Sequence, residues 1–144
     1  MPELPEVETT RRGLSPLVEG KTIERIIVRQ PKLRWAIPEQ IIHLQPTVVL
    51  RLRRRGKWLL WDLEQGHLLW HLGMSGSFRG WTEGPAPSKH DHVDVVIKDG
   101  GVIRYTDPRR FGALLWENQA PENNPMLARL GPEPLGGEFT GAHL

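Results

Sequence analysis

The chain has 144 residues, of which 38% are hydrophobic and 25% charged, and its formal net charge is +2. These values indicate one globular domain with its own core and exclude a disordered chain. No apolar run in the sequence approaches membrane-spanning length. Cysteine is absent, which excludes disulfides and thiolate metal sites and fits a reducing cytoplasm.

The first eight residues carry two prolines and three carboxylates in the order Met1-Pro2-Glu3-Leu4-Pro5-Glu6-Val7-Glu8. Such an acidic segment is no signal peptide. Removal of Met1 would leave Pro2 as a free secondary amine, which can form an iminium with an aldehyde-like carbon while Glu3 moves a proton. The same residues suit an ordinary helix start, because Pro and Glu both favour the first turn. Both interpretations stay open at this point.

A helix is expected over residues 5–17, because acidic side chains lie early in it and basic ones late, as the helix dipole favours. The chain beyond it is mostly strand-like, with short apolar or β-branched runs between charged or glycine-containing breaks. We expect strands over residues 22–28, 47–52, 58–63, 67–72, 93–97, 102–105 and 113–116, and short helices over 39–44 and 124–130. This pattern predicts a mainly β fold, a two-layer β-sandwich or flattened barrel of about eight strands with an N-terminal helix.

Three further segments are expected to be turns, loops or a linker. Lys98-Asp99-Gly100-Gly101 is typical of a hairpin turn. Residues 82–89, rich in Gly and Pro, indicate an exposed loop. The segment from Gly131 onward resembles a linker, so we expect a β-sandwich domain over residues 1–131 and the start of a linker over 132–144.

Two glycine- or proline-framed loops carry residues suited to DNA. Met74, in His71-Leu72-Gly73-Met74-Ser75-Gly76, is either a core plug or an exposed apolar probe. Arg109 and Phe111 follow Asp107-Pro108, and an apolar wedge with an arginine is what unstacks a base step and holds the orphaned partner. A lone phenylalanine commonly packs inward, so the structural alternative remains.

Two further segments, one rich in basic residues and one with two histidines, are candidates for binding a polyanion. Five cations crowd into seven positions, namely Arg51, Arg53, Arg54, Arg55 and Lys57, and suit either a polyanion surface or a solvated strand. Lys57 leads into an apolar strand, so it is either aimed into a cleft or an exposed strand start. His90-Asp91-His92-Val93-Asp94 lacks further ligands, so we expect no metal there; His90 is a candidate phosphate contact, and Asp91 or Asp94 would orient loop residues.

Taken in order, these motifs resemble the formamidopyrimidine-DNA glycosylase family. The matching segments are 2–8, Lys57, 71–76, 89–94 and 105–112, and the match ends with residues 130–135. The resemblance implies a bacterial base-excision-repair enzyme, a bifunctional glycosylase and AP lyase acting on oxidised purines, chiefly 8-oxoguanine and formamidopyrimidines. It implies Schiff-base chemistry followed by β,δ-elimination.

The resemblance also implies the catalytic roles. Pro2 would form the Schiff base with C1′ of the damaged nucleotide, and Glu3 would donate a proton near the sugar. Glu6 would be a supporting carboxylate and Lys57 the general acid/base of β-elimination. The chemistry is consistent, because a chain-terminal amine has a pKa of about 8, below the value of about 10.4 for lysine. We expect a raised pKa for Glu3 in the DNA-bound state, since an ionised Glu3 would favour the protonated amine.

DNA contacts follow from the same resemblance. His71, His90 and Arg109 would contact DNA, and Met74, Arg109 and Phe111 would fill the gap left by the flipped base. Arg109 would face the orphaned cytosine, with Phe111 wedged into the stack.

Cofactors and partners are expected by the same route. Family members continue into a helix–two-turn–helix domain and a four-cysteine zinc finger; zinc is expected there and no cofactor in this chain, which has no Cys. We expect the N-terminal domain of a cytoplasmic, nucleoid-associated monomer that binds damaged double-stranded DNA and no membrane. By itself it would bind DNA weakly and excise little.

Three alternatives stay open. A non-catalytic DNA-binding module would share the fold, and a retained Met1 would block the Pro2 amine. An endonuclease VIII-like glycosylase for oxidised pyrimidines is disfavoured, because that branch typically has Gly where this chain has Leu4. A protein-interaction sandwich would show no salt-dependent affinity for duplex DNA.

Overall fold

The computed structural model describes residues 4–98, 100–119, 121, 124–125 and 127. Its elements are α1 (Leu4–Val18), β1 (Thr22–Val28), α2 (Glu39–Ile42), β2 (Thr47–Arg55), β3 (Trp58–Leu63), β4 (His67–His71), β5 (Ser77–Trp81), β6 (Asp91–Ile97), β7 (Val102–Thr106) and β8 (Ala113–Glu117). No helix in this described part is long and apolar enough to cross a membrane.

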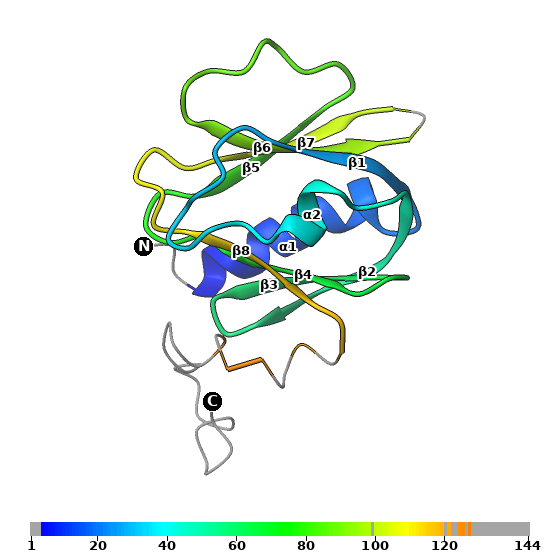
Figure 1. Cartoon of the computed structure of the whole chain (residues 1–144), viewed down its shortest axis with the longest axis horizontal. Coiled ribbons are helices and arrows are strands. Elements are labelled where there is room, and N and C mark those ends of the chain that lie inside the picture. The colour runs from blue at the N-terminus through cyan, green and yellow to red at the C-terminus, as the bar shows by residue number, and fades with distance from the viewer. Residues whose placement is uncertain (1–3, 99, 120, 122–123, 126, 128–144) are drawn as a thin grey trace.

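The eight strands form one antiparallel sheet in the order β5-β7-β6-β1-β2-β3-β4-β8. β1 and β2 pair at Thr22↔Val48 and Ile23↔Thr47, a short seam compared with the other strand pairs. At this seam the sheet folds over, so that β5-β7-β6-β1 lies above β2-β3-β4-β8 (Figure 1). The predicted two-layer β-sandwich is therefore confirmed.

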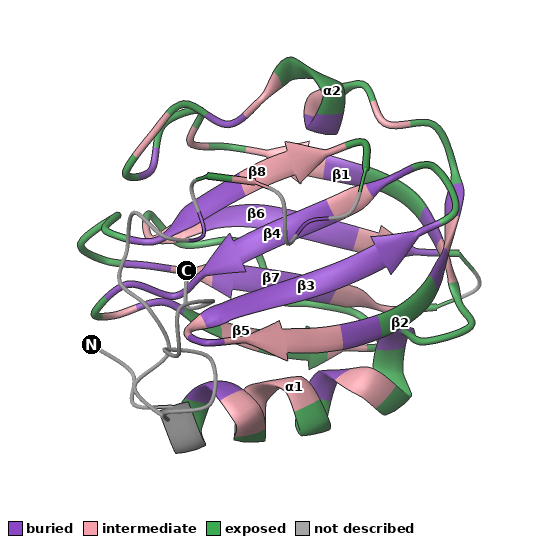
Figure 2. Ribbon diagram, turned by 90° about the horizontal axis from the view of Figure 1, so that it is seen from below, coloured by how far each residue is buried: buried purple, intermediate pink, exposed green. Residues whose placement is uncertain are grey.

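The core lies between the two layers and is rich in aromatic rings. Trp70 contacts Phe78 and Tyr105 with ring centroids 4.9 and 5.3 Å apart, and Trp61 lies 5.9 Å from Trp70. Every residue of β3 is buried (Figure 2), because a second apolar cluster that includes Leu127 covers its outer face. Burial of one such side chain stabilises the fold by about 1.5–3 kcal/mol.

Helix α1 covers one edge of the sandwich, beside β2 and β5 (Figure 2). Its buried residues Val7, Leu14 and Val18 recur at intervals that place them on one helix face. The interior position of Pro16 shows that the helix continues past a residue that commonly ends one.

The strand β5 is absent from the sequence-based expectations. Its sequence Ser-Phe-Arg-Gly-Trp has no apolar run, and it is an edge strand paired with β7 from Ser77↔Thr106 to Trp81↔Val102. Because an edge strand needs little apolar surface, tertiary pairing defines it. The expected helix over 39–44 is shorter, Glu39–Ile42. The expected helix over 124–130 lies largely outside the described residues, and the expected linker over 132–144 does so entirely.

Several connections meet at one end of the sandwich, called here the loop end: the β2–β3 turn, residues 72–76, residues 107–112 and the segment 29–36. The register Trp58↔His71↔Ala113 brings the first two together with the start of β8, and Arg34 N–H donates to Gly112 O at 2.9 Å. Figure 1 shows α1 beginning at this end, on the left.

Candidate nucleic-acid interface

Lys57 is presented by a two-residue turn between β2 and β3. Gly56 has φ 60°, a conformation that glycine adopts readily at the first central position of such a turn. Arg54 Nη1 donates to Gly56 O at 2.9 Å, and Arg54 Nε lies 3.4 Å from Glu8 Oε1. The turn that carries half-buried Lys57 is thus joined to the beginning of α1.

His71, the last residue of β4, is 1% exposed. Its Nδ1 accepts a hydrogen bond from Gly73 N–H at 3.0 Å, and its ring meets Trp58 edge-on with centroids 5.2 Å apart. Burial, together with the positive charges of Arg34 and Lys57, lowers the pKa of His71 to about 4. At neutral pH the proton therefore sits on Nε2, which has no hydrogen-bond partner within the described part of the chain. A buried unpaired donor costs about 1–3 kcal/mol, which an acceptor on a ligand would recover.

Met74, Arg109 and Phe111 come together on neighbouring loops. Met74 is 48% and Phe111 43% exposed, so neither is a core plug. Arg109 Nη1 lies 3.4 Å from Met74 Sδ. Two large apolar side chains and one guanidinium thus project from the loop end, as the wedge hypothesis requires.

Asp107 holds both loops. Its carboxylate is fully buried; Oδ1 accepts from Ser75 Oγ at 2.7 Å and Arg110 N–H at 3.0 Å. Oδ2 accepts from Tyr105 O–H at 2.7 Å and Gly112 N–H at 2.9 Å. Burial raises the pKa of Tyr105 well above its ordinary value, and the charge of Asp107 adds to this, so the phenol remains a donor. Four neutral donors surround one carboxylate, which fixes the loop without drawing in an arginine side chain.

The two loops also touch through their backbones. A Cβ on Gly73, which has φ 62°, would lie 2.6 Å from both Gly112 N and the carbonyl carbon of Phe111. Arg110 adopts φ 57°, an uncommon conformation for a residue other than glycine. The backbone donors that Asp107 binds on either side of Phe111 stabilise this conformation, so the loop projects Phe111 in one defined arrangement.

Arg34 is a site residue that the sequence did not reveal. Its Nε donates to Phe111 O at 2.9 Å, and its guanidinium lies 5.9 Å from the centres of the Phe111 and Trp35 rings. Because 77 residues separate Arg34 from Phe111, no local sequence pattern predicts this contact. The one available signal is the basic and aromatic run Lys32-Leu33-Arg34-Trp35.

His90 lies at the same end, half-buried, and its carbonyl accepts from Asp107 N–H at 3.0 Å. His92 Nε2 lies 2.7 Å from Asp107 O, so that ring is occupied in supporting the loop. Asp91 orients the preceding loop, as expected, by accepting from Ser88 N–H at 2.7 Å. Within the described residues no group of three His, Cys, Asp or Glu could hold a metal ion.

The arginine run of β2 is largely paired inside the fold. Arg51 Nε and Arg53 Nε each lie 2.7 Å from Asp62 Oδ2, and His67 Nδ1 lies 2.7 Å from Asp62 Oδ1. Burial raises the pKa of Asp62, but the hydrogen bonds from these three side chains outweigh it and leave the pKa below its ordinary value. This run is therefore a poor candidate for the main polyanion surface.

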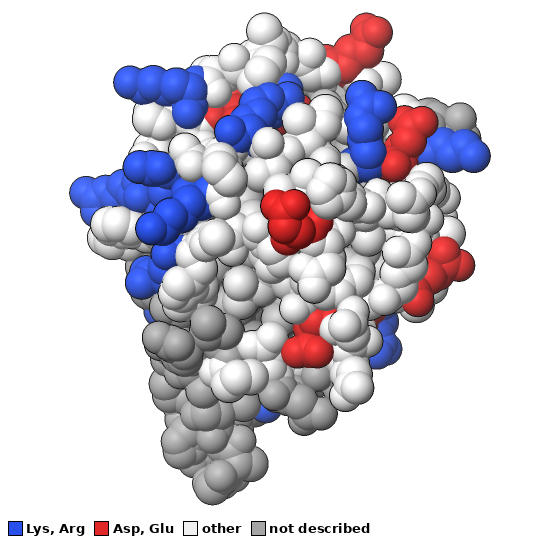
Figure 3. All heavy atoms as spheres, viewed as in Figure 1, with Lys and Arg blue, Asp and Glu red and all other residues white. Residues whose placement is uncertain are grey.

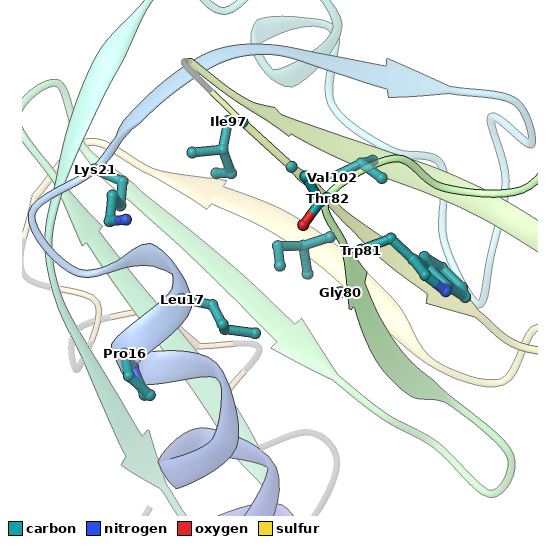
Figure 4. A pocket seen from close by; sticks show the side chains of 11 residues that line it. Pro16, Leu17, Lys21, Gly80, Trp81, Thr82, Ile97 and Val102 are labelled. Carbon is teal, nitrogen blue, oxygen red and sulfur yellow. The ribbon is translucent and has the colours of Figure 1, made fainter.

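A hollow of about 390 Å³ lies elsewhere, between the C-terminal end of α1, β5 and the β6–β7 hairpin (Figure 4). Leu17 projects into it and is 46% exposed. Among its lining residues in the described part of the chain, only Lys21 is ionisable. The hollow contains none of the predicted site residues and offers little for catalysis.

The structure thus gathers most of the predicted site at the loop end. Lys57, His71, Met74, His90, Arg109 and Phe111 lie there, with exposed Glu6 in the first turn of α1. Pro2 and Glu3 lie outside the described residues.

Comparison with known proteins gives a family match. Residues 1–114 match the family model described as the formamidopyrimidine-DNA glycosylase N-terminal domain. The chain is 54% identical over 144 residues to the formamidopyrimidine-DNA glycosylase of Shigella dysenteriae serotype 1, covering 100% of this chain and 53% of that protein. The chain therefore spans about half the length of the curated relatives it matches.

Two solved structures are similar as well. The MutM (Fpg) protein from Thermus thermophilus is 41% identical, with a TM-score of 0.75 over 96% of this chain and 49% of its own. The Lactococcus lactis Fpg in complex with DNA containing N7-benzyl-Fapy-dG is 34% identical, with a TM-score of 0.72 over 80% of this chain and 43% of its own.

Proposed function

The chain belongs to the formamidopyrimidine-DNA glycosylase family, and we propose that it excises oxidised purines from DNA as a glycosylase and AP lyase. The observation that carries the proposal is the loop end, where exposed Met74 and Phe111 flank Arg109 over the buried carboxylate of Asp107. An exposed apolar pair with an arginine, held on a rigid base, suits a duplex from which one base has been extruded.

The proposed reaction begins at Pro2. The Pro2 nitrogen forms a bond to C1′ as the bond from C1′ to the damaged base breaks, and Glu3 donates a proton near the sugar. The bond from C1′ to O4′ then breaks, O4′ takes up the proton from Glu3, and the nitrogen, having lost its own proton, forms the iminium with C1′. This iminium acidifies C2′, so that loss of the C2′ proton expels the 3′ phosphate; a second elimination expels the 5′ phosphate. Lys57 is the general acid/base of elimination and Glu6 a supporting carboxylate. The joining of the Lys57 turn to α1 supports this assignment.

The proposed DNA contacts use the other loop-end residues. Extruding a base costs a few kcal/mol, which insertion of Met74 and Phe111 offsets while Arg109 faces the orphaned cytosine. His71 and His90 bind backbone phosphates. The Nε2–H of neutral His71 supports this as a donor: its ring is oriented by Gly73, and the atom is buried without a hydrogen-bond partner within the described part of the chain.

The substrate class rests on family membership and on the relatives. The Lactococcus lactis protein binds DNA that carries a formamidopyrimidine derivative. 8-Oxoguanine and formamidopyrimidines are both altered at C8 of the purine, which is a carbonyl carbon in the first and a formamide carbon in the second. We propose both as substrates, with double-stranded DNA as partner.

Borohydride trapping tests the nucleophile. The chain, with removal of Met1 verified by mass spectrometry, is incubated with an 8-oxoguanine:cytosine duplex and borohydride, and the adduct is digested to locate the bond. We expect a covalent adduct at Pro2, at lower yield than the full-length Shigella dysenteriae relative, because the 144 residues correspond to 53% of that protein.

The matched control has one residue added before Pro2, which converts the amine into an amide. It keeps the fold and should trap no DNA. Equal trapping by this control would show that Pro2 is not the nucleophile.

A further inference from the structure

A cleft of about 400 Å³ adjoins the wedge loop, lined by Lys32, Leu33, Arg34, Arg109, Arg110 and Phe111. We call it the cationic cleft. Figure 3 shows Lys and Arg side chains gathered at the left of the molecule, where Figure 1 places residues 107–112 beside the segment 29–36. Four of the six lining residues are cationic, and none is acidic.

The cations of the cleft differ from most other arginines in having no carboxylate partner among the described residues. Arg29 is 2.7 Å from Asp94, for example, and Arg11 is 2.6 Å from Glu8. Within the described part of the chain, no ion pair joins the cleft's four cations to a carboxylate. Four like charges without a counter-ion attract an anion from solution.

Asp107, the carboxylate nearest to the cleft along the chain, does not neutralise these charges. It is fully buried, and its oxygens accept from Ser75, Tyr105 and two backbone N–H groups. The carboxylate of Asp107 thus lies inside the fold, while Arg109 and Arg110, between Pro108 and Phe111, remain exposed.

The cleft is also preorganised. Arg34 is held by its backbone bond to Gly112 O and its Nε bond to Phe111 O, each 2.9 Å. The bridge Lys32↔Ala36 and the bond from Lys32 N–H to Gln30 Oε1 at 3.2 Å shape the opposite wall. The charge of Arg34, already fixed in place, loses little freedom when a ligand binds.

We propose that the cationic cleft binds a backbone phosphate of the DNA strand that carries the orphaned base. The inference rests on the proposed function, in which Arg109 faces that base. Arg109 also lines the cleft, so a phosphate seated between Arg109 and Lys32 belongs to the same strand. Phosphate contacts of this kind fix the register of a protein on the duplex.

Lys32→Gln tests the inference, because among the described residues no contact of the Lys32 side chain competes with the loss of charge. Fluorescence anisotropy measures binding of the 144-residue chain to a labelled duplex with a tetrahydrofuran abasic site opposite cytosine, over a series of NaCl concentrations. We expect the Kd of Lys32→Gln to rise about 3–10-fold at low salt and the slope of log K against log salt to fall by about one. Arg25→Gln, an exposed cation on β1, is the matched control and should change neither.

A second arm identifies the strand. Phosphates are replaced one at a time by neutral methylphosphonate on each strand of the duplex. We expect one position on the strand opposite the abasic site at which the neutral group weakens DNA binding by the unmodified chain but does not weaken binding by Lys32→Gln.

The outcomes separate the inference from the proposed function. If Lys32→Gln behaves like Arg25→Gln while the unmodified chain binds with a strong salt dependence, the inference is wrong and the proposed function stands. The inference is also wrong if the methylphosphonate position that distinguishes the unmodified chain from Lys32→Gln lies on the strand with the abasic site. Absence of any salt-dependent binding by the unmodified chain contradicts both.

Discussion

Two buried carboxylates of this fold, Asp62 and Asp107, have opposite surroundings. Asp62 on β3 binds the guanidinium groups of Arg51 and Arg53, so it neutralises cations on the outer surface of the sheet. Asp107 binds neutral donors alone within the described residues and leaves Arg109 outside. The same residue type thus removes positive charge from one surface and supports a loop that presents positive charge at another.

The largest effect should follow from Asp107→Asn. The amide nitrogen replaces one acceptor and faces N–H or O–H donors, so two hydrogen bonds are lost inside the fold. We expect the free energy of unfolding to fall by about 3 kcal/mol and DNA affinity to fall with it. Urea denaturation and anisotropy measure the two. Ser75→Ala, which removes one donor, should cost about 1 kcal/mol; equal losses for both variants would contradict the central position of Asp107.

Next in size is the pH dependence due to His71. Its pKa is about 4 in the folded state and 6.5 in the reference state, so the unfolded chain takes up a proton first as the pH falls. The contribution is complete above pH 6.5 and is lost as the pH falls toward 4, by about 3 kcal/mol. His71→Gln keeps an acceptor for Gly73 N–H but does not titrate. Urea denaturation over this pH range should show that the free energy of unfolding falls more steeply with falling pH for the unmodified chain than for His71→Gln. An identical pH dependence for the two would contradict the prediction.

Asp62→Asn should have a smaller effect on stability and should not weaken DNA binding. Arg51 is 65% exposed and regains water when its partner is lost, so we expect a loss of about 1–2 kcal/mol in the free energy of unfolding. Affinity for the abasic duplex should be unchanged or slightly higher, since positive charge is released. A fall in affinity as large as that of Asp107→Asn would remove the distinction between the two carboxylates.

The smallest effect on stability is expected for Met74→Ala. The side chain is 48% exposed, so the free energy of unfolding should change by less than about 0.5 kcal/mol. The wedge role nevertheless predicts weaker binding to the abasic duplex, measured by anisotropy, with little change for an undamaged duplex. Leu17→Ala, at a similarly exposed residue of the remote hollow, is the control and should bind both duplexes normally.

The contrast also shows what a sequence can disclose. Alternation of apolar residues and turn residues predicted seven of the strands, because each of these strands buries an apolar run. The strand β5 was not predicted, because its stability comes from pairing with β7. The candidate residues Met74 and Phe111 were found through local motifs. Their exposure could not be predicted, because it depends on Asp107 contacts between two loops that are separated along the chain.

The role of Arg34, and the difference between paired and unpaired arginines, could not be predicted from the sequence because both depend on tertiary contacts. Arg51 and Arg34 look alike as members of basic segments, and only their tertiary partners, Asp62 and Phe111, distinguish them. The roles of Pro2 and Glu3 depend on the family resemblance and stay predictions.

The central claim is that the loop end, and not the arginine run of β2, meets DNA. Chemical-shift mapping of the ¹⁵N-labelled 16.4 kDa chain during titration with the abasic duplex tests it most directly. The largest shifts should occur at residues 32–34, 57, 71–76 and 107–112, with residues 51–53 and 62 little changed. Large shifts around Asp62 with an unperturbed loop end would contradict the account.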